Sequence, residues 1–449
     1  MENPSNRWSD GFGALQWFVF LLASAVTFPV VIGQMFHLPM QEVAELMQRT
    51  FFVVGVTCFL QGWRGHRLPI ADGPAGIWLS VFVVMGDAAI RHGQPLPEML
   101  RVLEGGMIIA GLLLLVLGLK GVVGRILFMF TPLVTGTFLL LLALQLSGVF
   151  LKGMLGLGGE PPRADALMSL VAFFVFILVL GLSIWGRGWW KSYAVLIGII
   201  AGWFAVWATG NSSLTAASDA WFRAPEIFVW GMPQWDLGMA VSAVLLSLIV
   251  LSSNVAAITA VEQVVQSDSG ETSKRLNHGA VASGITHVLS SAFSTVGIVP
   301  LAVSAGFIRL TGQNRMKPFL IASLLFAGIA LVPAAISVLA SLPGPVAYAA
   351  SMASFVQMVG IGFTSILRDP LDQRRLTILG VALLFGNGVM FLPSEIFQVM
   401  PSVVQYVCGN GLLVGTMLAL LLEQVWAAPK AGDGKIAKLE RNRKAAGRG

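Results

Sequence analysis

Apolar runs of about 20 residues recur along this chain from Gly13 to Trp426, and no soluble domain separates them. A hydrocarbon core of ~30 Å takes about 20 helical residues to cross, so these runs can span a bilayer. The composition agrees, because 56% of the residues are hydrophobic and 11% are charged, whereas soluble domains average about 25% charged residues. The sequence therefore predicts an all-α polytopic membrane protein.

Breaks at charged residues and at Gly/Pro clusters divide this apolar sequence into about fourteen transmembrane segments. They lie near residues 13–33, 49–63, 69–86, 102–119, 126–148, 166–185, 190–208, 238–264, 275–294, 296–310, 318–340, 343–366, 376–392 and 404–427. An even number of spans puts both termini on one side of the membrane. In that arrangement 22 of the 28 lysines and arginines lie on the side of the termini. The positive-inside rule then predicts that both termini are cytoplasmic.

The longest polar interruption separates seven predicted spans from seven others. Because each half has an odd number of spans, the second half would be inverted relative to the first, as in many transporters. The predicted organisation is a cytoplasmic N-terminus at 1–12, a first seven-span repeat at 13–208, an outer connecting loop at 209–237, a second seven-span repeat at 238–427 and a basic tail at 428–449. We expect this cytoplasmic tail to lie near anionic lipid.

The third span of each half is too rich in glycine and proline for a plain helix. Residues 72–76 read Asp-Gly-Pro-Ala-Gly in the first half, and Gly297, Pro300 and Gly306 interrupt the second. Irregular backbone is tolerated in a membrane only beside a cavity, a ligand or other protein, so paired interruptions in inverted halves indicate a transporter's substrate site. We therefore expect close backbone approach at Gly76 and Gly306. Two glycine-rich packing helices are the alternative.

Four separated motifs carry a resemblance to a known family. They are Gln16-Trp17, Arg67-Leu68-Pro69 leading to Gly73, the Phe-Thr-Pro-Leu-Val-Thr-Gly-Thr run at 130–137, and Gly306, Thr311 and Gly312 from a tenth-span signature. With these residues the chain resembles the nucleobase-cation symporter-2 family, also called the nucleobase/ascorbate transporters. The resemblance covers almost the whole chain and is strongest to the branch of uracil/xanthine or purine permeases.

This resemblance implies a fold and an activity. The fold has a core of spans 1–4 and 8–11, a gate of spans 5–7 and 12–14, and short extended segments in spans 3 and 10 beside the substrate. The activity is uptake of a purine or pyrimidine nucleobase across a bacterial inner membrane by alternating access, with proton symport as the family's usual coupling. Such a transporter is no enzyme and needs no cofactor, and a homodimer is compatible with it.

The side chains that relatives use as substrate anchors are changed in this chain. Alignment with the family places Ser253 at the main glutamate of the eighth span, Ala257 at a histidine four residues later, and Val303 at an acidic position of the tenth span. None of these three side chains can carry a proton, so an uncoupled nucleobase facilitator is an alternative to a symporter. An anion transporter of the related sulfate-permease fold is another alternative, although residues 428–449 are too few for the regulatory domain usual there.

Polar side chains, backbone groups and one ring remain to bind a base. Ser253 and Asn254 lie midway along a predicted span, where Asn offers both a donor and an acceptor and a polar pair indicates a site. Hydrogen bonding to a neighbouring helix is the alternative role for both. Trp17 would either stack on the base or pack in the core. The predicted substrate-binding residues are Ser253, Asn254, Gly76, Ile77, Val303, Ser304, Trp17 and Gln16.

Two acidic residues are candidates for carrying protons in place of the missing glutamates. Glu262 lies near the cytoplasmic end of its span, roughly 13 Å along a helix from Ser253, and Asp72 lies just inside the same boundary. His287 is interpreted as a packing residue. The chain has no zinc-protease, esterase or P-loop motif, so neither hydrolysis nor ATP-driven transport is indicated. Its basic residues lie in short loops and the tail, which argues against a nucleic-acid partner.

Overall fold

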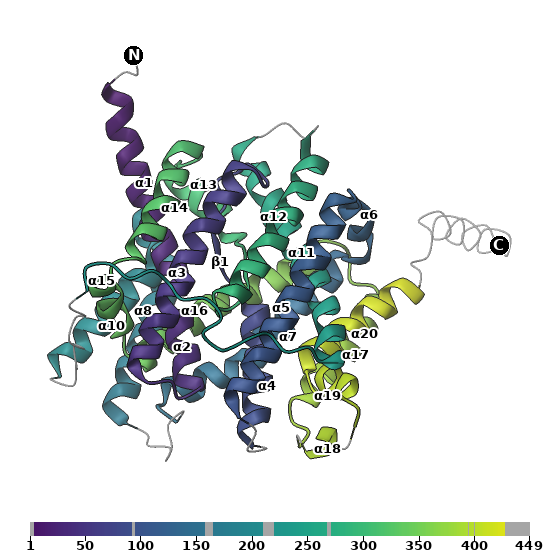
Figure 1. Cartoon of the computed structure of the whole chain (residues 1–449). Helices are drawn as coiled ribbons and strands as arrows, with labels where there is room; N and C mark the ends of the chain where they lie inside the picture. The colour runs from purple at the N-terminus through teal and green to yellow at the C-terminus, as the bar shows by residue number, and fades with distance from the viewer. Residues whose placement is uncertain are drawn as a thin grey trace, which may run out of the picture.

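The computed structural model describes residues 4–91, 95–157, 165–209, 220–266, 271–393, 395–398 and 400–426. These residues are mostly helical, with two short strands near the middle of the molecule (Figure 1). The basic tail predicted at 428–449 and residues 210–219 of the predicted outer loop lie outside the described residues.

One group of elements packs around the two strands, and we call it the strand bundle. Its elements are α1 (Pro4–Ala25), α2 (Thr27–Met35), α3 (Met40–Trp63), β1 (Asp72–Pro74), α4 (Gly76–Arg91), α5 (Leu96–Leu119), α11 (Leu237–Val265), α12 (Thr272–Ala292), β2 (Ile298–Pro300), α13 (Val303–Thr311), α14 (Met316–Ile329) and α15 (Pro333–Ala340). Helix α3 packs against α14, α5 packs against α12, α1 packs against α14, and α11 packs against α5. Elements from residues 4–119 and from residues 237–340 therefore pack against each other within this bundle.

The remaining elements form a second group, which we call the helix bundle. They are α6 (Val123–Ile126), η1 (Leu127–Met129), α7 (Pro132–Met154), α8 (Ala166–Trp185), α9 (Trp189–Ser192), α10 (Ala194–Ala208), α16 (Gly344–Ile366), α17 (Gln373–Val389), α18 (Glu395–Gln398), α19 (Ser402–Cys408) and α20 (Gly411–Val425). Helix α7 packs against α16, α17 against α20, and α8 against both α10 and α16. Contacts of α2 with α16, of α4 with α7 and of α11 with α19 join the two bundles.

Seven described helices are long and apolar enough to cross a membrane. Two bent pairs, α14 with α15 at 88° and α19 with α20 at 83°, would raise the number to nine if each pair is one span. Several other predicted spans are shorter helices, because the segments at 69–86 and 296–310 each divide into a strand and a helix. The prediction of a helical multi-span protein is confirmed, whereas the number fourteen stays a prediction.

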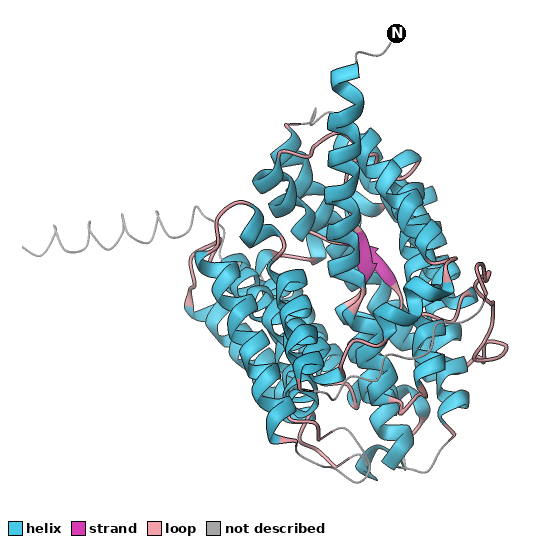
Figure 2. Ribbon diagram, turned by 90° about the vertical axis from the view of Figure 1, so that its left-hand side faces the viewer, coloured by secondary structure: helices cyan, strands magenta, loops and turns pink. Residues whose placement is uncertain are grey.

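The strands lie in the two glycine- and proline-rich segments and pair antiparallel, as Figure 2 shows in magenta. Opposite residues are Asp72 and Pro300, Gly73 and Val299, and Pro74 and Ile298. Two prolines in six residues suit a short ladder, because proline cannot donate a backbone hydrogen bond and would break a helix at these places. Gly297, just before β2, lies against the indole of Trp78, where an added side chain would collide.

Backbone groups next to the strand pair find partners elsewhere in the strand bundle. The Ala71 N–H donates to Oγ of Ser304 at 3.0 Å, and the Asp72 N–H donates to Sγ of Cys58 at 3.1 Å. The Leu301 N–H donates to the Ala71 carbonyl at 2.9 Å. These bonds satisfy buried backbone N–H donors that have no partner within the two-stranded ladder. They also fix where α13 begins relative to β1.

The family-like run at 130–137 forms the beginning of α7. Thr131 precedes the helix, its Oγ1 accepting a hydrogen bond from the Val134 N–H at 3.3 Å, and Pro132 takes the first helical position, where no N–H is needed. One turn on, a Cβ at Gly136 would lie 2.5 Å from the Gly362 carbonyl oxygen of α16. The run therefore starts α7 and lets it approach α16 closely.

Candidate functional site

Two helices begin directly after the paired strands. Gly76 and Ile77 form the first turn of α4, and Val303 and Ser304 form the first turn of α13. The first N–H groups of a helix have no partner within that helix and carry partial positive charge, so such ends attract acceptor atoms. Helix α11 packs against both β2 and α13. We take the strand ends, the two helix starts and the middle of α11 as the candidate substrate site.

Asn254 of α11 has one group committed to a neighbouring helix and one group uncommitted. Its side chain is 2% exposed, and Nδ2 donates to Oγ of Ser283 in α12 at 2.8 Å. Gln61 of α3 donates to the same hydroxyl at 3.0 Å. Oδ1 of Asn254 has no hydrogen-bond partner among the described residues. The interhelical bond predicted as its alternative role is therefore present, and an acceptor is left that a ligand donor can fill.

Asn254→Ala should raise the KM for the base about tenfold to a hundredfold, because an unmade hydrogen bond in a desolvated site costs about 1–3 kcal/mol. Ser283→Ala is the matched control, since it removes the partner of Nδ2 and leaves Oδ1 in place. Concentration-dependent uptake by both variants, at equal membrane abundance, distinguishes the two roles. Equal effects of the two substitutions would show that Asn254 only joins α11 to α12.

Side chains of the helix bundle close the strand end of this site. A Cβ at Gly76 would lie 3.1 Å from Cζ of Phe355 in α16 and 3.5 Å from a methyl group of Leu142 in α7. Oγ of Ser252, the neighbour of Ser253, lies 3.5 Å from Oγ1 of Thr135 in α7. The close approach expected at Gly76 is therefore present, and it joins the two bundles. The sequence did not mark Phe355 as a neighbour of Gly76, because this contact depends on which helix faces Gly76.

The start of α13 is arranged differently from the start of α4. Val303 is 48% exposed, and a Cβ at Gly306 would meet no described atom within 4 Å. The expectation of close approach at Gly306 is therefore wrong. The reason is that α13 turns its Val303–Gly306 side away from its packing partners, whereas Ser304 is buried and holds the Ala71 N–H.

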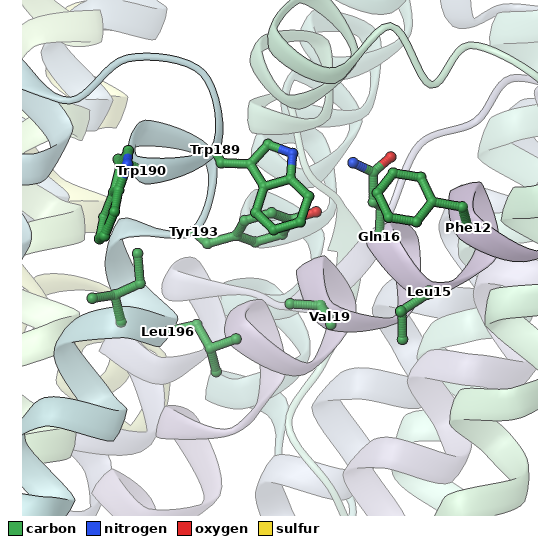
Figure 3. Close-up of a pocket in the computed structure, with 9 residues that line it drawn as sticks. Phe12, Leu15, Gln16, Val19, Trp189, Trp190, Tyr193 and Leu196 are labelled. Atoms are coloured by element: carbon green, nitrogen blue, oxygen red, sulfur yellow. The ribbon is translucent and has the colours of Figure 1, made fainter. Parts of the chain in front are cut away.

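Trp17 lies in an aromatic cluster and not at an open surface. It is 0% exposed, with ring centroids 4.5 Å from Phe307, 5.0 Å from Phe319 and 5.8 Å from Phe20. This is the packing role left open by the sequence, since no face of the indole is free to stack on a base. Gln16, its neighbour, instead lines a groove between α1 and α10 (Figure 3).

The two predicted proton carriers have different surroundings. Glu262 receives hydrogen bonds from Arg275 at 3.2 Å and Thr272 at 3.0 Å near the end of α11, so its charge is already balanced. Asp72 on β1 is completely buried, and neither carboxylate oxygen has a hydrogen-bond partner among the described residues. A buried carboxyl of this kind inside a membrane protein is expensive and usually functional.

A third buried carboxyl, Glu104 of α5, was missed by the sequence reasoning. It is 0% exposed, and its Oε1 accepts a hydrogen bond from Oγ of Ser294 at 2.6 Å, while Oε2 has no partner among the described residues. Arg49 and Arg101 lie near enough to act on it electrostatically. Ser294 precedes β2 and has the left-handed φ of 46°. Glu104 therefore holds the backbone that leads into the candidate site.

A segment at 220–236 covers this end of the strand bundle. The Trp230 N–H donates to Oγ of Ser294 at 3.3 Å, and Arg101 donates to the Trp230 carbonyl at 3.0 Å. Arg223 forms ion pairs with Glu45 at 3.0 Å and with Glu226 at 2.8 Å. The hydrogen bond from Arg223 lowers the pKa of Glu226. The segment is thus fastened to the same residues that surround Glu104.

Comparison with protein families decides what kind of protein carries this site. The xanthine/uracil permease model, described as "Permease family", matches residues 11–395. The chain belongs to this permease family. Among curated relatives, the permease is 31% identical to "Putative purine permease YwdJ" of Bacillus subtilis (strain 168) over 427 residues, which cover 94% of this chain and 97% of the relative. It is 24% identical to "Uric acid permease PucK" of the same organism over 428 residues, covering 94% and 96%. These relatives are transporters and not enzymes.

Solved structures similar to the permease are also transmembrane transporters. The transmembrane domain of the cyanobacterium bicarbonate transporter BicA matches with a TM-score of 0.59 and 15% identity, covering 91% of this chain and 97% of that one. SLC26A9 matches with a TM-score of 0.63 and 14% identity, covering 92% and 65%. At these identities the similarity shows the fold alone. It supports a transporter fold for the two bundles described above.

Proposed function

We propose that this permease transports a purine or pyrimidine nucleobase of the xanthine/uracil type across the inner membrane by alternating access. The observation that carries the proposal is the family match over residues 11–395 together with a site of the right chemistry. That site offers helix-start N–H groups at Gly76 and Val303, and the free acceptor of Asn254. A base presents donors and acceptors on a flat ring, so it can use all three.

The proposed machinery is a seven-plus-seven inverted repeat in which the strand bundle is the core and the helix bundle is the gate. The packing supports this division. Suppose that α3 of the first repeat corresponds to α12 of the second, and that α5 corresponds to α14. The α3–α14 contact and the α5–α12 contact are then equivalent. The α8–α16 and α17–α7 contacts are related in the same way. Such internal symmetry is usual for transporters in which one bundle of helices moves against another.

We propose protons as the coupling ion, with Asp72 and Glu104 as the groups that carry them. A coupling residue must gain and lose a proton, and its charge must bias either binding or the bundle movement. Ser253 and Val303 cannot do this, whereas Asp72 lies on β1 and the Glu104 carboxylate accepts a hydrogen bond from Ser294, which precedes β2. Glu262, paired with Arg275, is the third candidate. We also propose that both termini are cytoplasmic, which the distribution of basic residues favours.

Uptake of radiolabelled bases by cells that lack their own base permeases tests the proposed substrate class. We expect the permease to confer saturable uptake of at least one of xanthine, hypoxanthine, uric acid and uracil. An Asn254→Ala strain at equal membrane abundance is the control for uptake through the candidate site. Absence of uptake for all four bases, by protein that is inserted and folded, would contradict the proposal.

A further inference from the structure

A surface groove of about 390 Å³ lies between α1 and the α9–α10 segment (Figure 3). Phe12, Leu15 and Val19 of α1 form one wall, and Trp189, Trp190 and Leu196 form the other. The span that contains this part of α1 begins at Asp10, so the groove extends roughly 13 Å from the start of the span, at 1.5 Å per residue. It therefore opens in one leaflet near the membrane interface and not at the midplane.

Two polar side chains are recessed among these apolar walls. Gln16 is 6% exposed and Tyr193 is 8% exposed, and Figure 3 shows the amide and the phenol oxygen between the two walls. Neither Oε1 of Gln16 nor the Tyr193 hydroxyl has a hydrogen-bond partner among the described residues. Buried polar atoms without partners are costly, so their presence indicates a ligand that supplies both a donor and an acceptor.

Positive charge lies beside the same groove. Arg187 and Lys191 flank the two tryptophans in sequence and are exposed, and the exposed Arg309 lies in the last turn of α13, which packs against α9. Residues 185–200 include no acidic side chain. Tryptophan with neighbouring Lys and Arg is typical of the interface between protein and lipid head groups, and each such cation attracts an anionic surface.

We propose that this groove binds an anionic phospholipid of the cytoplasmic leaflet with a hydroxylated head group. One acyl chain lies between the walls formed by Leu15 and Trp189. A head-group hydroxyl donates to Oε1 of Gln16, the Tyr193 hydroxyl donates to an ester or phosphate oxygen, and the phosphate lies beside Arg187 and Lys191. A nucleobase fits less well, because its polar edges would face apolar walls on most sides.

The position of the groove gives the lipid a role in transport. Helix α1 belongs to the strand bundle, whereas α9 and α10 belong to the helix bundle. The Phe12–Trp189 stacking at 6.1 Å, the Tyr193–Phe307 pair at 6.3 Å and the packing of α13 against α9 connect the bundles here. A lipid in the groove touches both bundles at once, so its binding stabilises the arrangement in which the two walls have this separation.

Photocrosslinking in vesicles tests the site. The full-length permease is reconstituted in phosphatidylcholine vesicles that contain a trace of either phosphatidylglycerol or phosphatidylcholine with a photoreactive acyl chain. We expect phosphatidylglycerol to label peptides that contain residues 12–19 and 189–197 at least about tenfold more than phosphatidylcholine does, since two or three cations attract the anionic head group. Arg187→Gln with Lys191→Gln should remove this preference, and Tyr193→Phe should reduce it.

Lys120→Gln with Arg125→Gln is the matched control, because it removes the same charge from exposed residues of the α5–α6 connection. This control should label like the unsubstituted permease. Equal labelling by both lipids would show that the groove is filled by ordinary surrounding lipid and would overturn the proposal. Equal loss of the phosphatidylglycerol preference in the control and in the groove variant would overturn it as well. Displacement of the lipid by xanthine would show that the groove holds a solute and would also overturn it.

Discussion

Glu104→Gln should abolish proton-driven accumulation of the base while exchange of labelled for unlabelled base continues. Glutamine keeps an oxygen that can accept the 2.6 Å hydrogen bond from Ser294, so the backbone before β2 should keep its position. It cannot gain or lose a proton, so an imposed gradient can no longer bias the bundle movement. The measurement is base accumulation in sealed proteoliposomes with an inward proton gradient, alongside exchange without a gradient.

Three variants distinguish coupling at Glu104 from a purely structural role. Ser294→Ala removes the hydrogen bond and keeps the carboxyl, so it should lower stability without ending accumulation. Asp72→Asn and Glu262→Gln test the two other carboxyls in the same assay, and loss in one of them alone would move the role there. If the unsubstituted permease never accumulates base above equilibrium, and a protonophore changes nothing, the uncoupled facilitator is correct.

Gly76→Leu should stop transport in a permease that still inserts in the membrane. Even a Cβ at this position lies 3.1 Å from Phe355, so a leucine must push α4 away from α16 or fill the candidate site. Overpacking of this kind usually costs about 1–3 kcal/mol, and here the cost falls on the contact between the bundles. Uptake should drop by more than about tenfold, measured as initial rate per inserted molecule.

Gly306→Leu is the informative control for this prediction. Gly76 is the first residue of α4 and Gly306 is the fourth residue of α13, and a Cβ at Gly306 meets no described atom within 4 Å. We expect this variant to keep its stability and a larger part of its transport. Unchanged transport in Gly76→Leu would show that α4 and α16 can move apart without a cost to transport, and that Gly76 does not line the substrate path.

The sequence predicted where the two spans are interrupted because the cause of the interruptions is local. Proline and glycine at 72–76 and 297–306 break a helix whatever their neighbours are, so the interruptions could be read without a structure. The interhelical bond of Asn254 was foreseen as an alternative for the same kind of reason, since a buried amide needs some partner. Local chemistry determined these features, and the family resemblance predicted that they lie in one site.

Features that depend on which helices meet could not be read from the sequence. Glu104 stands in an apolar span beside Gly105 and Gly106, and only the packing of α5 on α12 brings Ser294 to its carboxyl. The sequence left two interpretations of Trp17, and its contacts with Phe307 and Phe319 support the packing role. Gly306 was expected to resemble Gly76, but α4 and α13 differ in what covers the first turn of each helix.

The most direct test of the central claim is counterflow in proteoliposomes that contain only this permease. Vesicles loaded with unlabelled xanthine, hypoxanthine, uric acid or uracil are diluted into a trace of the labelled form of the same base. Our account predicts transient, saturable entry of at least one labelled base, and its strong reduction by Asn254→Ala but not by Ser283→Ala. The result that would contradict it is folded permease that moves none of these bases, particularly if it instead exchanges sulfate or bicarbonate.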